Sequence, residues 1–248
     1  MMIVEAEMIT ERELEKETVS GFRLSPEQKH LWLLSHGNPT AAYQARCAVR
    51  IEGNLDSVAL KAALENVARQ HDILRTNFDF LTGMSTPLQV INDEAEISIR
   101  EYDLTALNAA EQESFIDSLW QESPVPAFDF KHGQLWRLSL VTLSQSEHAL
   151  LLSLPSLCAD GAGMSNLVSE ISQSYAALRE GRERTDDSIQ YPVLSEWLNE
   201  LLESESAEAG KEYWRQQNIF GLPGLKLASE KQAAFQQDFA PRILARNI

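Results

Sequence analysis

The sequence lacks the marks of a secreted or membrane protein. No run of about 18 apolar residues occurs, and the N-terminus does not show the basic and then apolar order of a signal peptide. The two cysteines, Cys47 and Cys158, form neither a CxxC pair nor a disulfide framework, which suits a reducing compartment. We therefore expect a cytoplasmic protein without a membrane partner, in which both cysteines are core residues.

Clusters of basic residues are also missing. The 248 residues include 37 acidic and 21 basic side chains, so the formal net charge is −16. The mean electrostatic field of such a chain repels phosphate backbones and anionic lipid, and no Lys/Arg cluster offsets it locally. This charge balance predicts that nucleic acid is not a partner.

The common nucleotide, metal and hydrolase motifs are absent as well. The chain has no GxGxxG, GxxxxGK[ST], HExxH or GxSxG sequence, and its five histidines (30, 36, 71, 132 and 148) show no metal-ligand spacing. We therefore expect no metal and no directly bound cofactor.

The patterns that are present indicate a mixed α/β protein with a substantial core, because 44% of the residues are hydrophobic. Residues 1–19 carry six glutamates and predict an acidic N-terminal arm, which we bound at 1–21. A strand is predicted over 43–53, followed by a helix that Asp56 caps and that runs to about residue 69. Further strands are predicted near 73–80, 87–92 and 96–102, and a helix over 109–122.

The second half of the chain predicts a hairpin and three helices. GQLWRLSLVTL and HALLLSLP flank a polar SQSE turn, which is typical of two paired strands. A long helix should follow Asp160, because apolar residues recur at helical spacing at Met164, Leu167, Val168, Ile171, Tyr175 and Leu178. Two more helices are predicted near 192–203 and 206–217.

Two places offer candidate chemistry. Ser156 and Cys158 flank a turn near Asp160, which allows a nucleophile with an acid partner, but no histidine lies nearby in sequence to act as its base. The alternative is that small residues simply end a strand. His71 could be a general base or a capping and packing residue.

Three stretches resemble motifs of one family, in the right order and at similar distances. LSPEQKHLWLL (24–34), ARQHDILRTNF (68–78) and LPSLCADG (154–161) resemble motifs of the condensation domain of nonribosomal peptide synthetases. EWLNELLESESAEAGKEYWRQQ (196–217) is similar to the Trp- and Tyr-Trp-bearing helices that follow in that family. The resemblance covers roughly residues 22–220.

The resemblance implies the chloramphenicol-acetyltransferase-like fold (the CoA-dependent acyltransferase superfold), with two lobes facing each other across a tunnel. We expect residues 22–220 to form the N-terminal lobe, a mixed sheet flanked by helices, and residues 221–248 to form a linker and the start of the C-terminal lobe. The implied substrates are acyl and aminoacyl thioesters on the phosphopantetheine arms of peptidyl carrier proteins. Adjacent synthetase domains are further implied partners.

The resemblance also implies which residues form the site. The second motif histidine of the family, which lies near the attacking amine, corresponds to Ser156, and the first corresponds to Pro155. The Asp-Gly pair is retained as Asp160 and Gly161. Ser156 and Gly161 are therefore the candidate catalytic positions, in a motif that has lost both histidines.

Three residues are expected to hold this site together. The resemblance implies that Asp160 pairs with Arg75, and we expect this ion pair to be buried and its loss to cost about 3–5 kcal/mol. His71, in the same motif as Arg75, and Pro155 are also expected to be structural.

Three functions follow as hypotheses. The first is an amide-forming domain whose catalysis is impaired or lost, and the second is a non-catalytic platform that recruits a carrier protein or a tailoring enzyme, such as an oxygenase. The third is an unrelated acyltransferase of the same superfold that uses a different residue. The loss of acid–base help should lower the rate by about 10²–10⁴-fold, while positioning of two tethered reactants could sustain residual amide synthesis.

Overall fold

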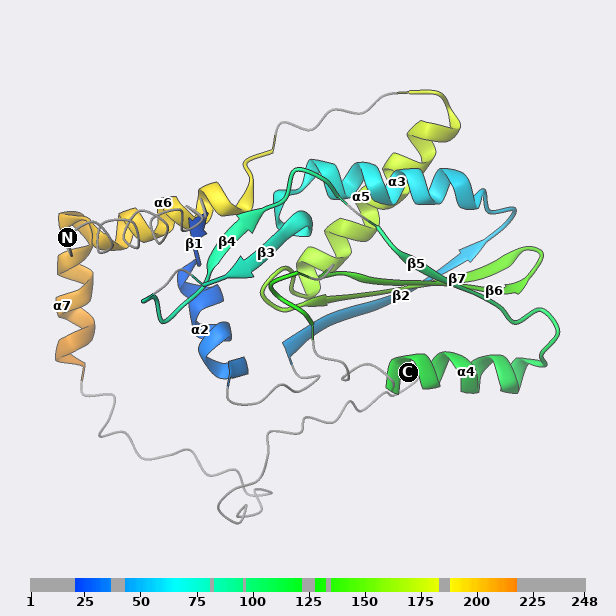
Figure 1. Cartoon of the computed structure of the whole chain (residues 1–248), viewed down its shortest axis with the longest axis horizontal. Coiled ribbons are helices and arrows are strands. Elements are labelled where there is room, and N and C mark those ends of the chain that lie inside the picture. The colour runs from blue at the N-terminus through cyan, green and yellow to red at the C-terminus, as the bar shows by residue number, and fades with distance from the viewer. Residues whose placement is uncertain are drawn as a thin grey trace, which may run out of the picture.

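The computed structural model describes residues 21–36, 43–80, 83–95, 97–121, 128–132, 135–182 and 188–217. Its larger sheet has four strands in the order β2-β7-β6-β5 (Figure 1). These strands are β2 (Gln44–Glu52), β5 (Ile99–Asp103), β6 (Arg137–Ser144) and β7 (Glu147–Pro155). β7 pairs antiparallel with both β2 and β6, and β5 pairs parallel with β6.

Helices cover both faces of this sheet. α3 (Ser57–Gln70) and α5 (Gly161–Arg179) lie on one face, and α4 (Ala109–Gln121) lies on the other (Figure 1). α3 begins where predicted, because the side chain of Asp56 accepts a hydrogen bond from the backbone N–H of Ala59 at 3.0 Å.

The two-sided cover explains the apolar run of β7. Leu150, Leu152 and Leu154 point into the main core beneath α3 and α5, while Ala149 and Leu151 point to the α4 side. Consecutive side chains of a strand face opposite sides, so a strand covered on both faces needs apolar residues at nearly every position. The main core also takes in the predicted helix residues, with Leu60, Leu64, Val67, Met164, Leu167 and Ile171 all buried.

A smaller antiparallel sheet packs beside the larger one. Its order is β1-β4-β3, formed by β1 (Phe22–Arg23), β3 (Thr76–Asp79) and β4 (Leu88–Ile91). α2 (Pro26–His36) and a 3₁₀ turn η2 (Asp72–Arg75) belong to the same region. An aromatic cluster lies here, which we define by its buried residues Leu24, Trp32, Phe78, Phe128, Leu135 and Leu157.

The described chain ends in two helices that project from this smaller sheet. α6 (Tyr191–Glu203) packs against β1 and α2, and after a short 3₁₀ turn, η3 (Glu205–Ala207), α7 (Glu208–Gln216) follows. Within the described ranges, no helix is both long and apolar enough to cross a membrane.

The mixed α/β architecture and the hairpin are confirmed, as are the predicted helices. One segment differs, because residues 73–80 begin as a 3₁₀ turn and become a strand only at Thr76. Both cysteines are free, half-buried and packed against the main core. The predicted acidic arm lies outside the described residues except for Gly21, and the predicted segment 221–248 lies wholly outside them.

Candidate functional site at the end of β7

The stretch that resembles the family's active-site motif forms the end of β7 and a tight turn. Pro155 is the last residue of the strand and is fully buried. Its carbonyl accepts hydrogen bonds from the backbone N–H groups of Cys158 (2.8 Å) and Ala159 (3.3 Å), and the N–H of Ser156 donates to the carbonyl of Tyr43 (2.9 Å). These bonds fix the backbone of the turn on the rigid sheet.

Asp160 connects the turn to α5 as the N-cap of that helix. Its Oδ1 accepts a hydrogen bond from the backbone N–H of Gly163 at 2.7 Å, and its carbonyl accepts one from Met164 at 2.9 Å. A Cβ at position 163 would lie 3.3 Å from this Oδ1, so glycine there leaves room for the cap. Gly161 is the first helical residue, and a Cβ on it would meet no atom within 4 Å.

The predicted buried ion pair between Asp160 and Arg75 is wrong. Asp160 is exposed, and the guanidinium of Arg75 instead pairs with Asp72 at 2.6 Å and donates to the carbonyl of Asn92. Asp72 opens the 3₁₀ turn that Arg75 ends, so the nearer acid, three residues away, takes the guanidinium. The carboxylate of Asp160 is meanwhile occupied by its own helix terminus.

His71 lies at the C-cap of α3, and its backbone N–H donates to the carbonyl of Val67 at 3.1 Å. Its Nε2 pairs with a carboxylate oxygen of Glu170 on α5. His71 therefore links two helices that cover the same face of the sheet. This geometry favours the capping and packing interpretation over a general base for Ser156.

Cys158 does not behave as an activated nucleophile. Its side chain packs between the main core and the aromatic cluster, and burial raises the pKa of its thiol to about 12. Since the thiolate is the reactive form, a thiol that stays protonated at neutral pH is a poor nucleophile. Along the turn, this leaves the hydroxyl of Ser156 as the remaining candidate.

A buried amide that sequence reasoning missed lies behind the turn. Nε2 of Gln28 on α2 donates to the carbonyl of Leu157 at 3.0 Å and to Oε1 of Gln89 at 3.1 Å. Its Oε1 accepts from the N–H of Ser25 (3.0 Å), while Oγ of Ser25 accepts from the N–H of Gln28 (3.1 Å). The signal was present in the sequence, because Ser-x-x-Gln is the pattern of a reciprocal N-terminal capping box.

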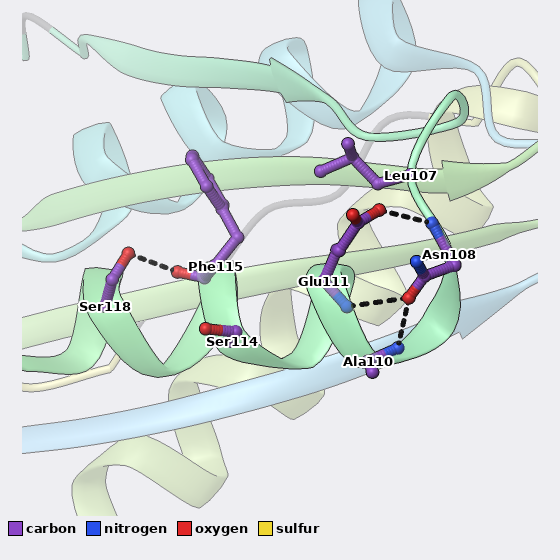
Figure 2. Close-up of a pocket in the computed structure, with 7 residues that line it drawn as sticks. All are labelled: Leu107, Asn108, Ala110, Glu111, Ser114, Phe115 and Ser118. Atoms are coloured by element: carbon purple, nitrogen blue, oxygen red, sulfur yellow. Dashed lines mark hydrogen bonds between the residues drawn. The ribbon is translucent and has the colours of Figure 1, made fainter.

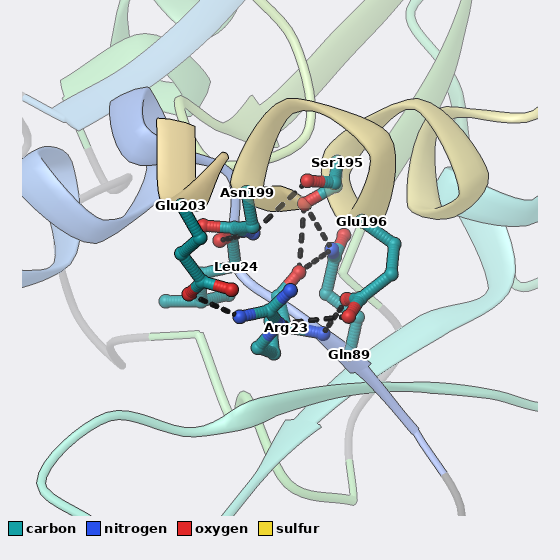
Figure 3. Close-up of polar contacts among 7 residues, drawn as sticks. All are labelled: Arg23, Leu24, Gln89, Ser195, Glu196, Asn199 and Glu203. Atoms are coloured by element: carbon teal, nitrogen blue, oxygen red, sulfur yellow. Dashed lines mark hydrogen bonds and ion pairs between the residues drawn. The ribbon is translucent and has the colours of Figure 1, made fainter. Parts of the chain in front are cut away.

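The polar contacts continue from Gln89 into α6 (Figure 3). Nε2 of Gln89 donates to the carbonyl of Arg23 (2.9 Å) and to Oγ of Ser195 (3.2 Å), and that hydroxyl donates to the same carbonyl (2.7 Å). Nδ2 of Asn199 donates to the carbonyl of Leu24 at 2.9 Å. The turn after β7 is thus connected through α2 and β4 to α6.

The surface hollow beside α4, with a volume of about 530 Å³, offers little chemistry (Figure 2). Oδ1 of Asn108 accepts from the N–H groups of Ala110 and Glu111, each at 3.1 Å, and Oε2 of Glu111 accepts from the N–H of Asn108 at 3.0 Å. Because these donors at the helix N-terminus already have partners, they offer no ready-made anion site.

A second cavity of about 330 Å³ lies between β2, α3 and α5, and its lining does not include Ser156. It is mostly apolar and is formed by Val49, Arg50, Ile51, Glu52, Leu55, Leu60, Leu150, Val168, Ile171, Ser172 and Tyr175. Over the ranges that the structure describes, no group of three His, Cys, Asp or Glu side chains lies close enough to hold a metal ion.

Comparison with known families identifies the family of the chain. The family model described as the condensation domain matches residues 20–247. The chain belongs to the condensation-domain family. Relatives among curated proteins include a linear gramicidin synthase protein of Brevibacillus parabrevis, 31% identical over 211 residues, and bacitracin synthase 3 of Bacillus licheniformis, 30% identical over 200 residues. These alignments cover 84% and 80% of this chain but only 4% and 3% of the two synthases.

Solved condensation-type structures show the same fold. The X-domain from teicoplanin biosynthesis, in complex with OxyB, is 29% identical with a TM-score of 0.68, over 79% of this chain and 43% of the X-domain chain. The starter condensation domain of the rhizomide synthetase RzmA is 22% identical with a TM-score of 0.69, over 79% of this chain and 47% of that chain. The predicted acyltransferase-like fold is confirmed, and the chain spans about half of these solved chains.

Proposed function

We propose that this condensation-domain chain acts in nonribosomal peptide synthesis on acyl and aminoacyl thioesters held on carrier proteins, with an impaired or lost acid–base step. In this proposal residues 22–220 are the N-terminal lobe of a two-lobed domain, and residues 221–248 are a linker and the start of the second lobe. The names of the curated relatives support the pathway class, and the length of the solved relatives, about twice the matched part, supports the two lobes.

One observation carries the proposal: the turn after β7 has no imidazole, because Pro155 and Ser156 occupy the positions of the motif histidines. Pro155 is buried and lacks a backbone N–H, and the hydroxyl of Ser156 is a poor base. Cys158 has a pKa of about 12, and the carboxylate of Asp160 caps α5. Loss of general acid–base help lowers a rate by about 10²–10⁴-fold.

The supporting structure of the turn is nevertheless complete. The strand, the backbone bonds of Pro155, the Asp160 cap and the Gln28 amide all hold it in one conformation. A site that keeps its geometry can still bring two tethered reactants together, which is a large part of catalysis. Binding of loaded carrier proteins should therefore outlast efficient chemistry.

A platform function is the second candidate. Its support is the 29% identity to an X-domain that was solved in complex with OxyB. By analogy, this chain would recruit a carrier protein or a tailoring enzyme without forming a bond. Membership of the condensation-domain family leaves these two candidates ahead of an unrelated acyltransferase.

Ser156→His separates the two candidates. The test uses this chain followed by a C-terminal lobe, together with acyl- and aminoacyl-loaded carrier proteins. We expect normal folding and unchanged carrier affinity in both cases. A gain in amide formation identifies a weakened enzyme, whereas no gain with binding intact identifies a platform. Failure of both loaded carriers to bind the wild-type protein contradicts the enzyme and the carrier-binding platform, and leaves only recruitment of a tailoring enzyme.

A further inference from the structure

We propose that Gln28 is the positioning residue of the turn 156–158, and that together with Gln89 it couples this turn to α6. The turn is the backbone on which the Ser156 side chain is carried, so its position sets where that side chain lies. The inference concerns the turn itself and does not depend on whether amide formation occurs there.

Gln28 is suited to this role because every polar group of its amide is used. The side chain is 2% exposed, its oxygen accepts from Ser25, and its nitrogen donates to both Leu157 and Gln89. A flipped amide would place its NH₂ group against the N–H of Ser25 and its oxygen against two other oxygens. The amide therefore has one satisfied orientation, and it holds the carbonyl of Leu157 in one place.

Leu157 is held at both its backbone and its side chain. While its carbonyl accepts from Gln28, its side chain is 6% exposed within the aromatic cluster. A shift of the turn would remove the side chain from this cluster and leave a buried amide donor without a partner. The turn therefore moves only if α2 or the aromatic cluster moves with it.

The coupling to α6 passes through residues that are fully buried. Gln89 and Ser195 are each 0% exposed, and both bond to the backbone carbonyl of Arg23. The sequence of contacts from Leu157 to Gln28, Gln89 and Ser195 contains no solvent-exposed step. Buried polar chains of this kind are sensitive to the loss of any one member.

Two native cysteines allow opening of the turn to be detected. Cys158 follows Leu157 and packs between the main core and the aromatic cluster, whereas Cys47 lies on β2 and packs only against the main core. Opening of the turn should expose the half-buried Cys158 further and remove the burial that suppresses its thiolate, so its alkylation should become faster. The ratio of the two alkylation rates thus separates local opening from global unfolding.

The test is alkylation of the native 248-residue chain by iodoacetamide at pH 8, followed by peptide mass spectrometry. Gln28→Glu keeps the size and the oxygen that Ser25 needs, but it replaces the donor with an oxygen facing two other oxygens. We expect the ratio of Cys158 to Cys47 alkylation rates to rise at least tenfold. An unchanged ratio, or equal acceleration at both cysteines, overturns the proposal.

Gln112→Glu is the matched control. Nε2 of Gln112 also donates two hydrogen bonds, in this case to the backbone carbonyls of Leu104 and Leu143, each at 2.9 Å, but beside α4. This variant should leave the ratio unchanged, and a similar rise would overturn the proposal, because the loss of a half-buried amide donor elsewhere would then open the turn as well.

If Gln28→Glu does not fold, hydrogen exchange of the wild-type chain decides. The N–H groups of Cys158 and Ala159 should then be as protected as those of β7, and free exchange at these two amides contradicts a fixed turn.

Discussion

Asp160 shows how one side chain can be retained in a motif for a local reason. Its exposed carboxylate accepts the N–H of Gly163, and this bond satisfies a donor that the first turn of α5 would otherwise leave free. The role needs only a short acceptor side chain at the N-cap. Helix capping therefore accounts for an acidic residue at position 160 that has no buried charge partner.

The capping role predicts a moderate effect of Asp160→Ala. The free energy of unfolding, measured with urea, should fall by about 1 kcal/mol, because loss of an N-cap acceptor costs this much. Asp160→Asn, which keeps an acceptor of the same length, should be close to wild type. A loss of about 3 kcal/mol or more would contradict the capping role, because it is the loss expected for a buried ion pair.

At this scale the sequence predicted the helix start at Asp160 but not the partner of Arg75. An acid at the N-cap, followed by glycine and an apolar repeat, is a local pattern, so the start of the helix can be predicted from neighbouring residues alone. The choice of Arg75 between Asp72 and Asp160 depends on distances in space, and the i,i+3 neighbour is closer. Gln28 was missed because a capping glutamine gives no sign of its second contact, with Leu157.

The thiol of Cys158 predicts a pH dependence of stability. In the unfolded chain its pKa is about 8.5, and in the folded chain it is about 12. Between these values the unfolded state releases a proton that the folded state keeps, so stability is full below pH 8.5 and falls as pH rises.

We therefore expect the wild type to lose up to about 1.4 kcal/mol per pH unit more than Cys158→Ala above pH 9, in urea titrations from pH 8 to 11. Parallel curves for the two proteins would show that the thiol ionises freely in the folded state.

At the scale of elements, α6 is held by a buried polar contact and by surface ion pairs. Oγ of Ser195 bonds to the carbonyl of Arg23 and to Gln89 in a fully buried position. The Arg23 guanidinium pairs with Glu196 (2.8 Å) and Glu203 (2.6 Å), and its hydrogen bond to Glu196 is the main reason why its pKa is raised (Figure 3). The ion pairs of the Arg23 guanidinium are solvated. The buried hydrogen bonds of Ser195 should therefore contribute more to stability than these ion pairs do.

This contrast predicts which of two substitutions lowers the free energy of unfolding more. Ser195→Ala should lower the free energy of unfolding by about 1–3 kcal/mol, since it leaves the buried Gln89 amide short of a partner. Arg23→Met removes two ion pairs but should cost about 1 kcal/mol or less, because exposed pairs gain little. Thermal unfolding of both variants checks this, and the reverse order would contradict it.

Elements with a strong period were predicted with close limits, whereas the short strands were predicted only in part. α5 and the β6–β7 hairpin are long and patterned, so their limits were close to the observed ones. Strands at the positions of β3 and β4 were predicted, but β1 and the pairing of these strands in a smaller sheet were not, because β1 has two residues and β3 and β4 have four each. Such strands are defined by pairing with distant segments, which periodicity does not reveal.

At the scale of the whole molecule, the described surface has an apolar region on its last helices. Val193, Trp197 and Leu201 recur at four-residue spacing on α6 and are 51%, 55% and 42% exposed, and Trp214 on α7 is 66% exposed. Contiguous exposed apolar groups favour association. In the proposed two-lobed domain, the second lobe would provide a further surface in contact with this chain.

This region predicts self-association of the chain when it is produced alone. Trp197→Glu should shift the protein toward monomer in analytical ultracentrifugation at micromolar concentration. Val58→Glu is the control, because Val58 is an isolated apolar side chain on α3 that is 79% exposed, and it should change nothing. A wild-type chain that is monomeric at every concentration would contradict the expectation.

The central claim is that the turn after β7 keeps its geometry but no longer supplies proton transfer. The most direct test is single-turnover amide formation by this chain joined to a C-terminal lobe, comparing wild type with Ser156→Ala on loaded carrier proteins. We expect equal rates within about twofold, because the serine hydroxyl contributes no acid–base help. A fall of about 100-fold or more with carrier binding intact would show that Ser156 is catalytic, and would contradict the claim.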